Sequence, residues 1–337
     1  MKRIAVITSG GDAPGMNACI RAIVLTASQH DIEVIGFRHG FRGIVEDLNQ
    51  PLHPNDMRLV SQRGGTILLS SRYPQFKEVD AARQAAAVLD QHDISALVVI
   101  GGDGSFRGAH HLDQYWDGQV LGLPGTIDND LAGTDTTIGF TTAVDTAMEA
   151  IDRIRETAEA MARVFLIEVM GRHAGFIGLH SAIAGSAEAM LVPELEPQPK
   201  LADLADSIRR ARQAFPDSSY LIVVSENLWP GGVEELARQL TQATGTTCHS
   251  APLGHIQRGG RPNAADRILS MQLGQAAVHA VLDGISGHMI GVEQGHVVRV
   301  PLHLTFERDK QLDSRLVDLQ LGLQQLNFAS NVVKESA

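Results

Sequence analysis

Cysteine is nearly absent from this chain of 337 residues, which contains only Cys19 and Cys248. Two cysteines are too few for a disulfide framework, so we expect a reducing, cytoplasmic location. No apolar run approaches the roughly 20 residues that cross a membrane. The first residues are basic, but Gly10 and Gly11 follow too early for a signal peptide.

Basic residues are fewer than acidic ones, and the net charge is −11. This balance argues against nonspecific binding to nucleic acid or to an anionic membrane, and we expect neither as a partner. Anionic metabolites can still bind where arginines cluster. His173 and His255 lack the spacing of metal ligands, so we assign no zinc site. An apolar content of 44% allows one large or two moderate domains with a buried core.

Short apolar runs alternate with helical patterns along most of the chain. The runs do not alternate in polarity, as expected for strands that are covered on both faces. Helical periodicity marks Val144 to Ile154 and Leu201 to Ala211. This alternation predicts an α/β fold with mainly parallel sheets. The expected strands are 4–8, 34–37, 96–100, 120–123, 164–169 and 220–224, with a late hairpin formed by 288–292 and 296–300.

Three turns at strand ends carry the residue types of phosphoryl-transfer chemistry. The first, Ser9 to Asn17, combines glycines with a following helix expected from about Asn17 to Ser28, which suits a phosphate as well as it suits an ordinary tight turn. The second is Gly101-Gly102-Asp103-Gly104-Ser105. Its aspartate could hold Mg²⁺ together with substrate phosphates, or it could cap the next helix.

The third turn, Thr126 to Asp130, places Asp128 and Asp130 two residues apart in a loop. Like charges this close cost free energy unless a cation or hydrogen-bond donors offset them. One of the two carboxylates fits a general base for a sugar hydroxyl, and surface turn chemistry is the alternative. In parallel sheets, ligands bind beyond the carboxyl ends of the strands, where these turns lie.

Two later segments bring arginines beside glycines. Arg172, in Met170 to Gly175, follows the strand 164–169, and Arg163 precedes it and should face the opposite edge or a neighbour. Leu253 to Pro262 contains His255, Arg258 and Arg261. Arginine binds phosphate through two parallel hydrogen bonds, so both segments are candidate anion sites.

These motifs, in this order and spacing, resemble the bacterial ATP-dependent 6-phosphofructokinases. The resemblance extends from Met1 to about Leu304 and rests on 9–17, 101–105, 124–130, 170–172 and 254–260. A Gly-Gly-Asp-Gly turn alone also occurs in lipid kinases and NAD kinases, whereas the loop ending in Asp128-Asn129-Asp130 favours this family. A lipid kinase is further disfavoured because the sequence has no basic amphipathic segment.

The resemblance implies a role for each matching residue. Asp128 would take the proton of the 1-hydroxyl of fructose 6-phosphate, with Thr126 beside it, while Arg172 and the Gly11 backbone N–H stabilise the transferring phosphoryl group. Asp103 would hold Mg²⁺. The ATP site would be lined by Gly11, Phe41 (near the adenine), Arg72, Tyr73, Gly102, Asp103, Gly104, Ser105 and Gly108. The sugar phosphate would be bound by Met170, Gly171, Arg172, Glu226, His255 and Arg258.

The family also shares active sites between subunits, with Arg163 reaching into an adjacent one. The resemblance therefore implies a homotetramer with two three-layer α/β/α domains per chain. Residues 1–140 and 257–304 would form the ATP-binding domain, and 141–256 and 305–337 the sugar-phosphate-binding domain. ATP is the expected donor, because pyrophosphate-using relatives carry Asp where this chain has Gly104 and Lys where it has Gly125, and glycines would leave room for the nucleotide.

Two departures from the family pattern stand out. His249 replaces an arginine that reaches the 6-phosphate from the neighbouring subunit, unless the loop is shifted by one residue. Histidine has an ordinary pKa of about 6.5, so it is largely uncharged above neutral pH. In the effector site, Arg21, Arg155 and Glu188 match, but the expected basic residues are replaced by Leu25, Pro54, Phe215 and Asp217. We therefore expect weak or absent allosteric control.

Two rival functions remain open at this point: a kinase of another sugar phosphate, such as tagatose 6-phosphate, and a noncatalytic metabolite-binding subunit. Intact Asp103, Asp128 and Arg172 argue against the second. Towards the end of the chain, the apolar spacing of Leu312, Leu316, Leu319, Leu323 and Leu326 suits a docking helix or an assembly contact.

Overall fold

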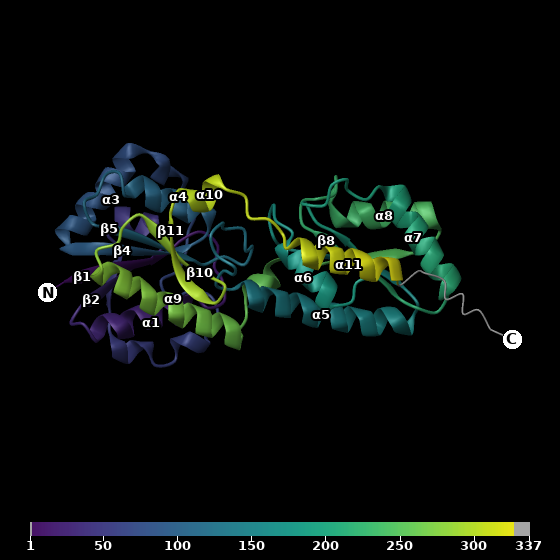
Figure 1. The fold of residues 1–337 in the computed structure, drawn as a ribbon, viewed down its shortest axis with the longest axis horizontal. Coiled ribbons are helices and arrows are strands. Elements are labelled where there is room, and N and C mark those ends of the chain that lie inside the picture. Colours follow the sequence, from purple (N-terminus) through teal and green to yellow (C-terminus); the bar gives the residue numbers. More distant parts are fainter. Residues whose placement is uncertain (1, 327–337) are drawn as a thin grey trace. The chain divides into compact units, whose positions relative to one another are not determined.

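The computed structural model describes residues 2–326, and its chain divides into two compact units (Figure 1). Unit 1 comprises residues 1–143 and 258–310, and unit 2 comprises residues 144–257 and 311–337. The chain therefore passes between the units three times. One passage lies within helix α5, Phe140–Ala160.

Unit 1 contains a sheet of seven strands in the order β11-β10-β5-β4-β1-β2-β3. Its central pairs are parallel, while β2–β3 and β10–β11 at the edges are antiparallel. The central strands are buried along almost their whole length, which explains their continuous apolar sequences. The strands are β1 Arg3–Thr8, β2 Glu33–Phe37, β3 Asn49–Leu52, β4 Ile94–Gly101, β5 Gln119–Pro124, β10 His288–Glu293 and β11 His296–Pro301.

Helices cover both faces of this sheet (Figure 1). Helices α1 and α9 pack against each other on one face, and α3 and α4 contribute to a core with Phe37 and Phe106 on the other. Unit 1 is thus a three-layer α/β/α domain. Its helices are α1 Met16–Ser28, α2 Phe41–Val45, α3 Val79–Gln91, α4 Asp103–Leu112, α9 Ala264–Leu282 and α10 Leu304–Glu307, with short 3₁₀ turns at Pro54–Met57, Val60–Gln62 and Pro74–Lys77.

Unit 2 is built around a parallel sheet of four strands in the order β7-β8-β6-β9. Helices α7 and α8 bury their apolar faces on one side of it, and α6, which contacts β7 and β8, is packed in turn by α11. The elements are β6 Val164–Val169, α6 Phe176–Ala184, β7 Ala189–Leu191, α7 Leu201–Ala214, β8 Tyr220–Ser225, α8 Gly232–Thr244, β9 Cys248–Pro252, the 3₁₀ turn Gly254–Arg258 and α11 Ser314–Leu326.

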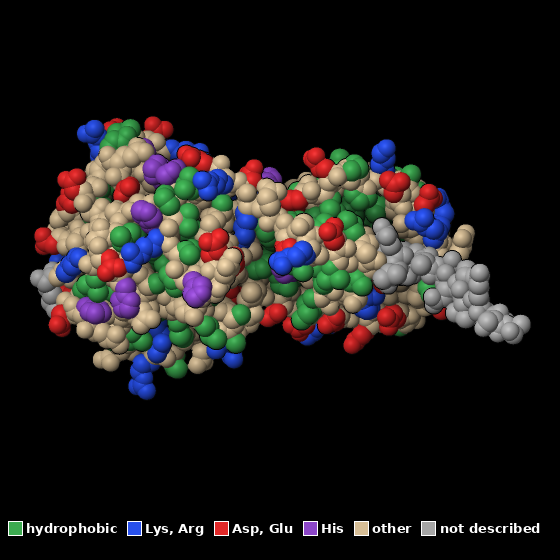
Figure 2. Space-filling view, viewed as in Figure 1, with side chains coloured by type: hydrophobic (Ala, Val, Ile, Leu, Met, Phe, Trp, Pro, Cys, Tyr) green, Lys and Arg blue, Asp and Glu red, His purple; other side chains and the backbone are tan. Residues whose placement is uncertain are grey.

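The α/β fold class and the six strands and one hairpin expected from the sequence are confirmed. Strands β3, β7 and β9 were not expected. Both cysteines are free and buried. No helix among residues 2–326 combines the length and apolar character needed to cross a membrane. On the face drawn in Figure 2, acidic and basic side chains are interspersed.

Helix α11 confirms the helix expected in the leucine-rich segment. Within unit 2 the buried side chain is Gln320, whose Nε2 donates to the Ala187 carbonyl at 3.0 Å. Leu319 and Leu323 are 47% and 39% exposed. Leu312 and Leu316 are half-buried, so the role of the leucine stripe as a docking face or an assembly contact stays a prediction. The Leu326 side chain lies outside the described residues.

Candidate active site

The three glycine- and aspartate-containing turns of unit 1 lie side by side, because they follow the adjacent strands β1, β4 and β5. The β4–β5 register pairs Gly101 with Pro124, and the Gly125 N–H donates to the Gly101 carbonyl at 2.9 Å. The Ser9 N–H likewise donates to the Ile100 carbonyl at 3.0 Å. Parallel pairing therefore brings segments about 90 and 115 residues apart to one sheet edge.

In the first turn, Gly11 contacts the guanidinium group of Arg258. A Cβ atom added at Gly11 would collide with Arg258 Nη1, and the same nitrogen lies 3.4 Å from the Asp12 carbonyl. A side chain at position 11 would therefore displace the arginine. The turn leads directly into α1, whose N-terminal N–H groups have no side-chain cap, an arrangement that favours anions.

In the second turn, Asp103 is the first residue of α4. Its carboxylate accepts from Arg107 Nε at 3.1 and 3.2 Å and is partly exposed. The described residues contain no cluster of three or more His, Cys, Asp or Glu that could hold a metal ion. A single partly exposed carboxylate nevertheless fits Mg²⁺, which binds through one or two carboxylates and fills its other positions with water and substrate phosphates.

Gly104 and Gly125, the two glycines from which ATP is expected as the donor, differ in their surroundings. A Cβ atom at Gly104 would have nothing within 4 Å, so this position is open as expected. At Gly125 the expectation of free space is wrong. A Cβ there would lie 2.9 Å from Ile100 Cγ2 and 3.1 Å from Met16 Cε, so the glycine is required by packing within the chain.

The third turn is rigidly held. Thr126 and Asp128 are both buried, at 8% and 7% exposure, and the Asp128 N–H donates to Thr126 Oγ1 at 3.2 Å. Thr137 Oγ1 donates to the Thr126 carbonyl at 2.6 Å. Gly102 lies beside Thr126, since a Cβ at Gly102 would be 3.3 Å from Thr126 Cβ. The turn that contains Asp128 therefore lies next to the Asp103 turn.

Phe41, which is expected near the adenine, lies on the α2–α4 side of unit 1 with other residues of the expected ATP site. Phe41 opens α2 and stacks on Phe76 at 4.2 Å between ring centroids. A Cβ at Gly108 would lie 2.8 Å from Phe41 Cε2, so Gly108 allows α4 to approach this ring. Tyr73 packs against the same core, whereas Arg72 is exposed. Ser105 is buried next to Gly10.

In unit 2, Glu226 holds the turn that contains Arg172. Strands β6 and β8 end together, and Glu226 Oε1 accepts from the N–H groups of Gly171 at 3.2 Å and Arg172 at 2.8 Å. Gly171 and Arg172 both have positive φ, at 149° and 60°. The Arg172 conformation is one that a side chain rarely adopts, so the two hydrogen bonds stabilise a strained turn and leave Arg172 exposed.

Gln257 is a contributor to this turn that sequence reasoning missed. Its side chain is fully buried, and Oε1 accepts from the Met170 N–H at 2.8 Å. His255, two residues earlier, is exposed beyond the end of β9. Nearby, burial and the charges of Glu234 and Glu226 raise the pKa of Glu168 on β6. The carboxyl ends of β8, β6 and β9 thus present Glu226, Met170 to Arg172, and His255 together.

Arg163 and His249 lie at the opposite end of this sheet, as expected for Arg163. Arg163 immediately precedes β6, and the β6–β9 register pairs Phe165 with His249. The His249 ring stacks on Phe165 with 5.0 Å between centroids. The structure therefore brings these two residues to one edge and separates both from Arg172.

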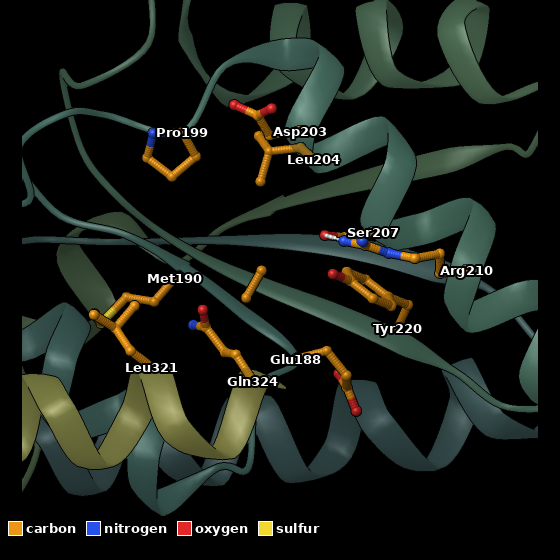
Figure 3. Close-up of a pocket in the computed structure, with 11 residues that line it drawn as sticks. Glu188, Met190, Pro199, Asp203, Leu204, Ser207, Arg210, Tyr220, Leu321 and Gln324 are labelled. Carbon is orange, nitrogen blue, oxygen red and sulfur yellow. Dashed lines mark hydrogen bonds between the residues drawn. The ribbon is translucent and has the colours of Figure 1, made fainter. Parts of the chain in front are cut away.

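The matching residues of the expected effector site are engaged within their own units. Arg155 donates to Glu188 at 3.0 Å and also to the carbonyls of Gly185 and Ser186. Arg21 Nε donates to the Met57 carbonyl at 3.1 Å, and Phe215 is exposed. Glu188 also borders a pocket of about 380 Å³ between α7, β7 and α11, which Arg210, Tyr220 and Gln324 help to line (Figure 3).

Comparison with known proteins identifies the family. The family model described as phosphofructokinase matches residues 3–281. The chain is 49% identical to ATP-dependent 6-phosphofructokinase 1 of Thermus thermophilus, covering 95% of this chain and 98% of the relative. It is 41% identical to the ATP-dependent 6-phosphofructokinase of Bacillus licheniformis, covering 96% and 99%.

Among solved structures, phosphofructokinase from Saccharomyces cerevisiae matches with a TM-score of 0.84 and 32% identity. The match covers 97% of this chain and 47% of the yeast chain, so this chain spans about half the length of that relative. The sequence motifs, the fold and these similarities agree. The chain therefore belongs to the phosphofructokinase family.

Proposed function

We propose that this protein is a 6-phosphofructokinase, which transfers the γ-phosphoryl group of MgATP to the 1-hydroxyl of D-fructose 6-phosphate and yields fructose 1,6-bisphosphate in glycolysis. The observation that carries the proposal is the placement of Asp103 and Asp128 on neighbouring turns at the ends of β4 and β5. The names and full-length coverage of the bacterial relatives support the same activity.

In the proposed mechanism, Asp128 accepts the proton of the 1-hydroxyl as the hydroxyl oxygen attacks the γ-phosphorus. The bond from this phosphorus to the β–γ bridging oxygen breaks, and ADP leaves with that oxygen. The buried loop holds the carboxylate in place, which is what positioning catalysis requires. Arg172 and the Gly11 N–H stabilise charge on the transferring group. Asp103 would hold Mg²⁺, whose chemistry is to neutralise phosphate charge.

The remaining residues divide between the two substrates. We assign ATP binding to unit 1 through Phe41, Arg72, Tyr73, Gly102, Gly104, Ser105 and Gly108. We assign the sugar phosphate to Met170, Gly171, Arg172, Glu226 and His255 of unit 2, together with Thr126 and Arg258 of unit 1. This follows the expected division into an ATP-binding and a sugar-phosphate-binding domain, with Arg163 and His249 serving the site of an adjacent subunit in a cytoplasmic homotetramer.

We propose ATP rather than pyrophosphate as donor. The open space at Gly104 supports this choice, because a nucleotide phosphate can approach there, whereas the packed surroundings of Gly125 do not bear on it. We also propose weak allosteric control. Arg155 already has three acceptors within its own unit, so its guanidinium is less available to a dianionic effector.

One assay of the purified protein tests this proposal and its rivals. Initial rates are compared for ATP and pyrophosphate, and for fructose 6-phosphate and tagatose 6-phosphate, at two pH values and with added ADP. We expect the highest kcat/KM with ATP and fructose 6-phosphate, and little response to ADP. A preference for tagatose 6-phosphate or for pyrophosphate would contradict the proposal, and strong activation by ADP would contradict weak control. Complete inactivity would favour a noncatalytic role.

A further inference from the structure

Lys310 lies against the loop that contains Asp128, although it is about 180 residues away in sequence. It follows α10 and is the last residue of unit 1 before the chain passes to unit 2. Its ammonium group donates to Asn129 Oδ1 at 2.8 Å and to the Asp135 carbonyl at 3.0 Å. The Lys310 side chain therefore connects Asn129 and Asp135, both in the loop 126–135, to the segment where the chain leaves unit 1.

The contact between Lys310 and Asn129 affects Asp128 because Asn129 is its neighbour in the chain. It is 3% exposed and adopts a left-handed backbone conformation, with φ of 55°. Its amide Nδ2 also lies 3.4 Å from the Asp135 carbonyl. Because Asn129 separates Asp128 from Asp130 in the chain, the orientation of its backbone sets the directions in which the two carboxylates leave the loop.

The charge of Lys310 also suits this position. The acidic groups of Asp130 and Asp135 face the ammonium group and stabilise its charged form. Burial acts more strongly in the other direction and lowers the pKa of Lys310 to about 8. The group is consequently charged at neutral pH and supplies the kind of cation that two closely spaced aspartates require.

We propose that Lys310 is a positioning residue for phosphoryl transfer: by holding Asn129 and balancing the charge of Asp130, it fixes the direction in which Asp128 presents its carboxylate. The inference rests on the function proposed above, since it gives Asp128 the role of base. Asp135 Oδ2 in turn accepts from the Gln294 N–H at 2.6 Å, so the far end of the loop is anchored to the β10–β11 turn.

The kinetic test compares Lys310→Met, Lys310→Arg and the control Lys200→Met, which replaces an exposed lysine at the start of α7. We expect Lys310→Met to lower kcat by on the order of 10- to 100-fold, as small misplacements of a catalytic group do. KM values for ATP and fructose 6-phosphate should change by less than about threefold, because the binding groups remain. Lys200→Met should match the wild type.

The pH profile separates positioning from a merely structural role. With a pKa near 8, Lys310 loses its charge as the pH rises, so kcat of the wild type should fall above about pH 8. In Lys310→Arg this fall in kcat should move to higher pH, because arginine stays charged. The kcat of this variant at neutral pH should be largely retained. A Lys310→Met variant with wild-type kcat and pH profile would overturn the proposal. So would a loss in both variants that only follows a lower melting temperature.

A second measurement does not depend on activity and therefore distinguishes failure of this inference from failure of the proposed function. Amide hydrogen exchange of the peptide covering residues 126–135 should be faster in Lys310→Met than in wild type or Lys200→Met. Unchanged exchange in this peptide would refute the positioning role, even if the wild-type protein phosphorylated no sugar. The chain has only five lysines, so carbon-13 labelling of lysine also allows the Lys310 titration to be followed directly.

Discussion

At the scale of single residues, we expect His249 to stand where the family carries an arginine that reaches the 6-phosphate from a neighbouring subunit. It lies on β9, stacked on Phe165, at the same sheet edge as Arg163. Arginine binds phosphate through a fixed pair of hydrogen bonds and remains charged at all working pH values, whereas histidine is charged only under mildly acidic conditions. A site that uses histidine at this position should therefore bind an anionic sugar phosphate less tightly than one that uses arginine.

The first prediction concerns the change His249→Arg. We expect the KM for fructose 6-phosphate to be lower in the variant than in the wild type, because arginine binds phosphate through two parallel hydrogen bonds. The KM for ATP should not differ between them. Steady-state kinetics at one fixed pH provide the measurement. An unchanged KM for fructose 6-phosphate would show that His249 does not contact the sugar phosphate.

Residues differ in how readily the sequence reveals them. Asp103 and Asp128 could be predicted because each directly follows an apolar strand in a glycine-containing turn. Gln257 and Lys310 could not, because their contacts cross 87 and 181 residues of sequence and arise only when the chain is folded. The need for a glycine at position 125 could not be predicted either. It arises from the close packing of Ile100 and Met16, which no local sequence pattern reveals.

At the scale of elements, the turn after β6 depends on the end of β8. Glu226 accepts two backbone N–H groups there and holds Arg172 in a left-handed conformation. Removing a charged acceptor that serves two donors costs about 1–3 kcal/mol, because both N–H groups lose their partner. The same loss would let Arg172 turn away from the site.

The second prediction follows for Glu226→Ala. We expect a lower melting temperature and a KM for fructose 6-phosphate raised on the order of 10-fold, which corresponds to about 1.4 kcal/mol. Glu226→Gln keeps an oxygen acceptor and should restore stability more fully than it restores KM. Glu149→Ala, which removes an exposed carboxylate on α5, is the control. Melting curves and sugar titrations that match the wild type would rule out this role for Glu226.

The long buried strands could be predicted because their sequences are continuously apolar. Strand β3 (Asn-Gln-Pro-Leu) and β9 (Cys-His-Ser-Ala-Pro) lie at sheet edges and each has one buried residue, while β7 has only three residues. Their pairing comes from neighbouring strands rather than from local hydrophobicity. In helix α11 the buried contact made by Gln320 could not be predicted, because its carbonyl partner on Ala187 lies far away in the sequence.

At the scale of the whole molecule, the proposed homotetramer explains why Arg163 lies far from Arg172 along β6. The two residues occupy opposite ends of one strand and cannot both line a single site at its carboxyl end. If Arg163 completes the site of an adjacent subunit, each active site combines residues from two chains. Assembly is then a requirement for activity.

The third prediction uses two defective variants, Arg163→Ser and Asp128→Asn. Each alone should have little activity. After mixing under conditions that dissociate and reassemble the subunits, we expect activity to reappear, because some sites then contain both native residues. Sedimentation should show a species of about four times 36.2 kDa. If mixed oligomers form but activity does not return, Arg163 and Asp128 do not act across a subunit boundary.

The last measurement is the turnover of Asp128→Asn, assayed together with ATP and fructose 6-phosphate binding. Asparagine keeps the shape of the side chain but cannot accept the hydroxyl proton. We predict that kcat falls by about 10²- to 10⁴-fold, the usual contribution of a general base, while both ligands still bind. Asp117→Asn, an exposed replacement after α4, should retain full activity. A fully active Asp128→Asn enzyme would contradict phosphoryl transfer between the Asp103 and Asp128 turns.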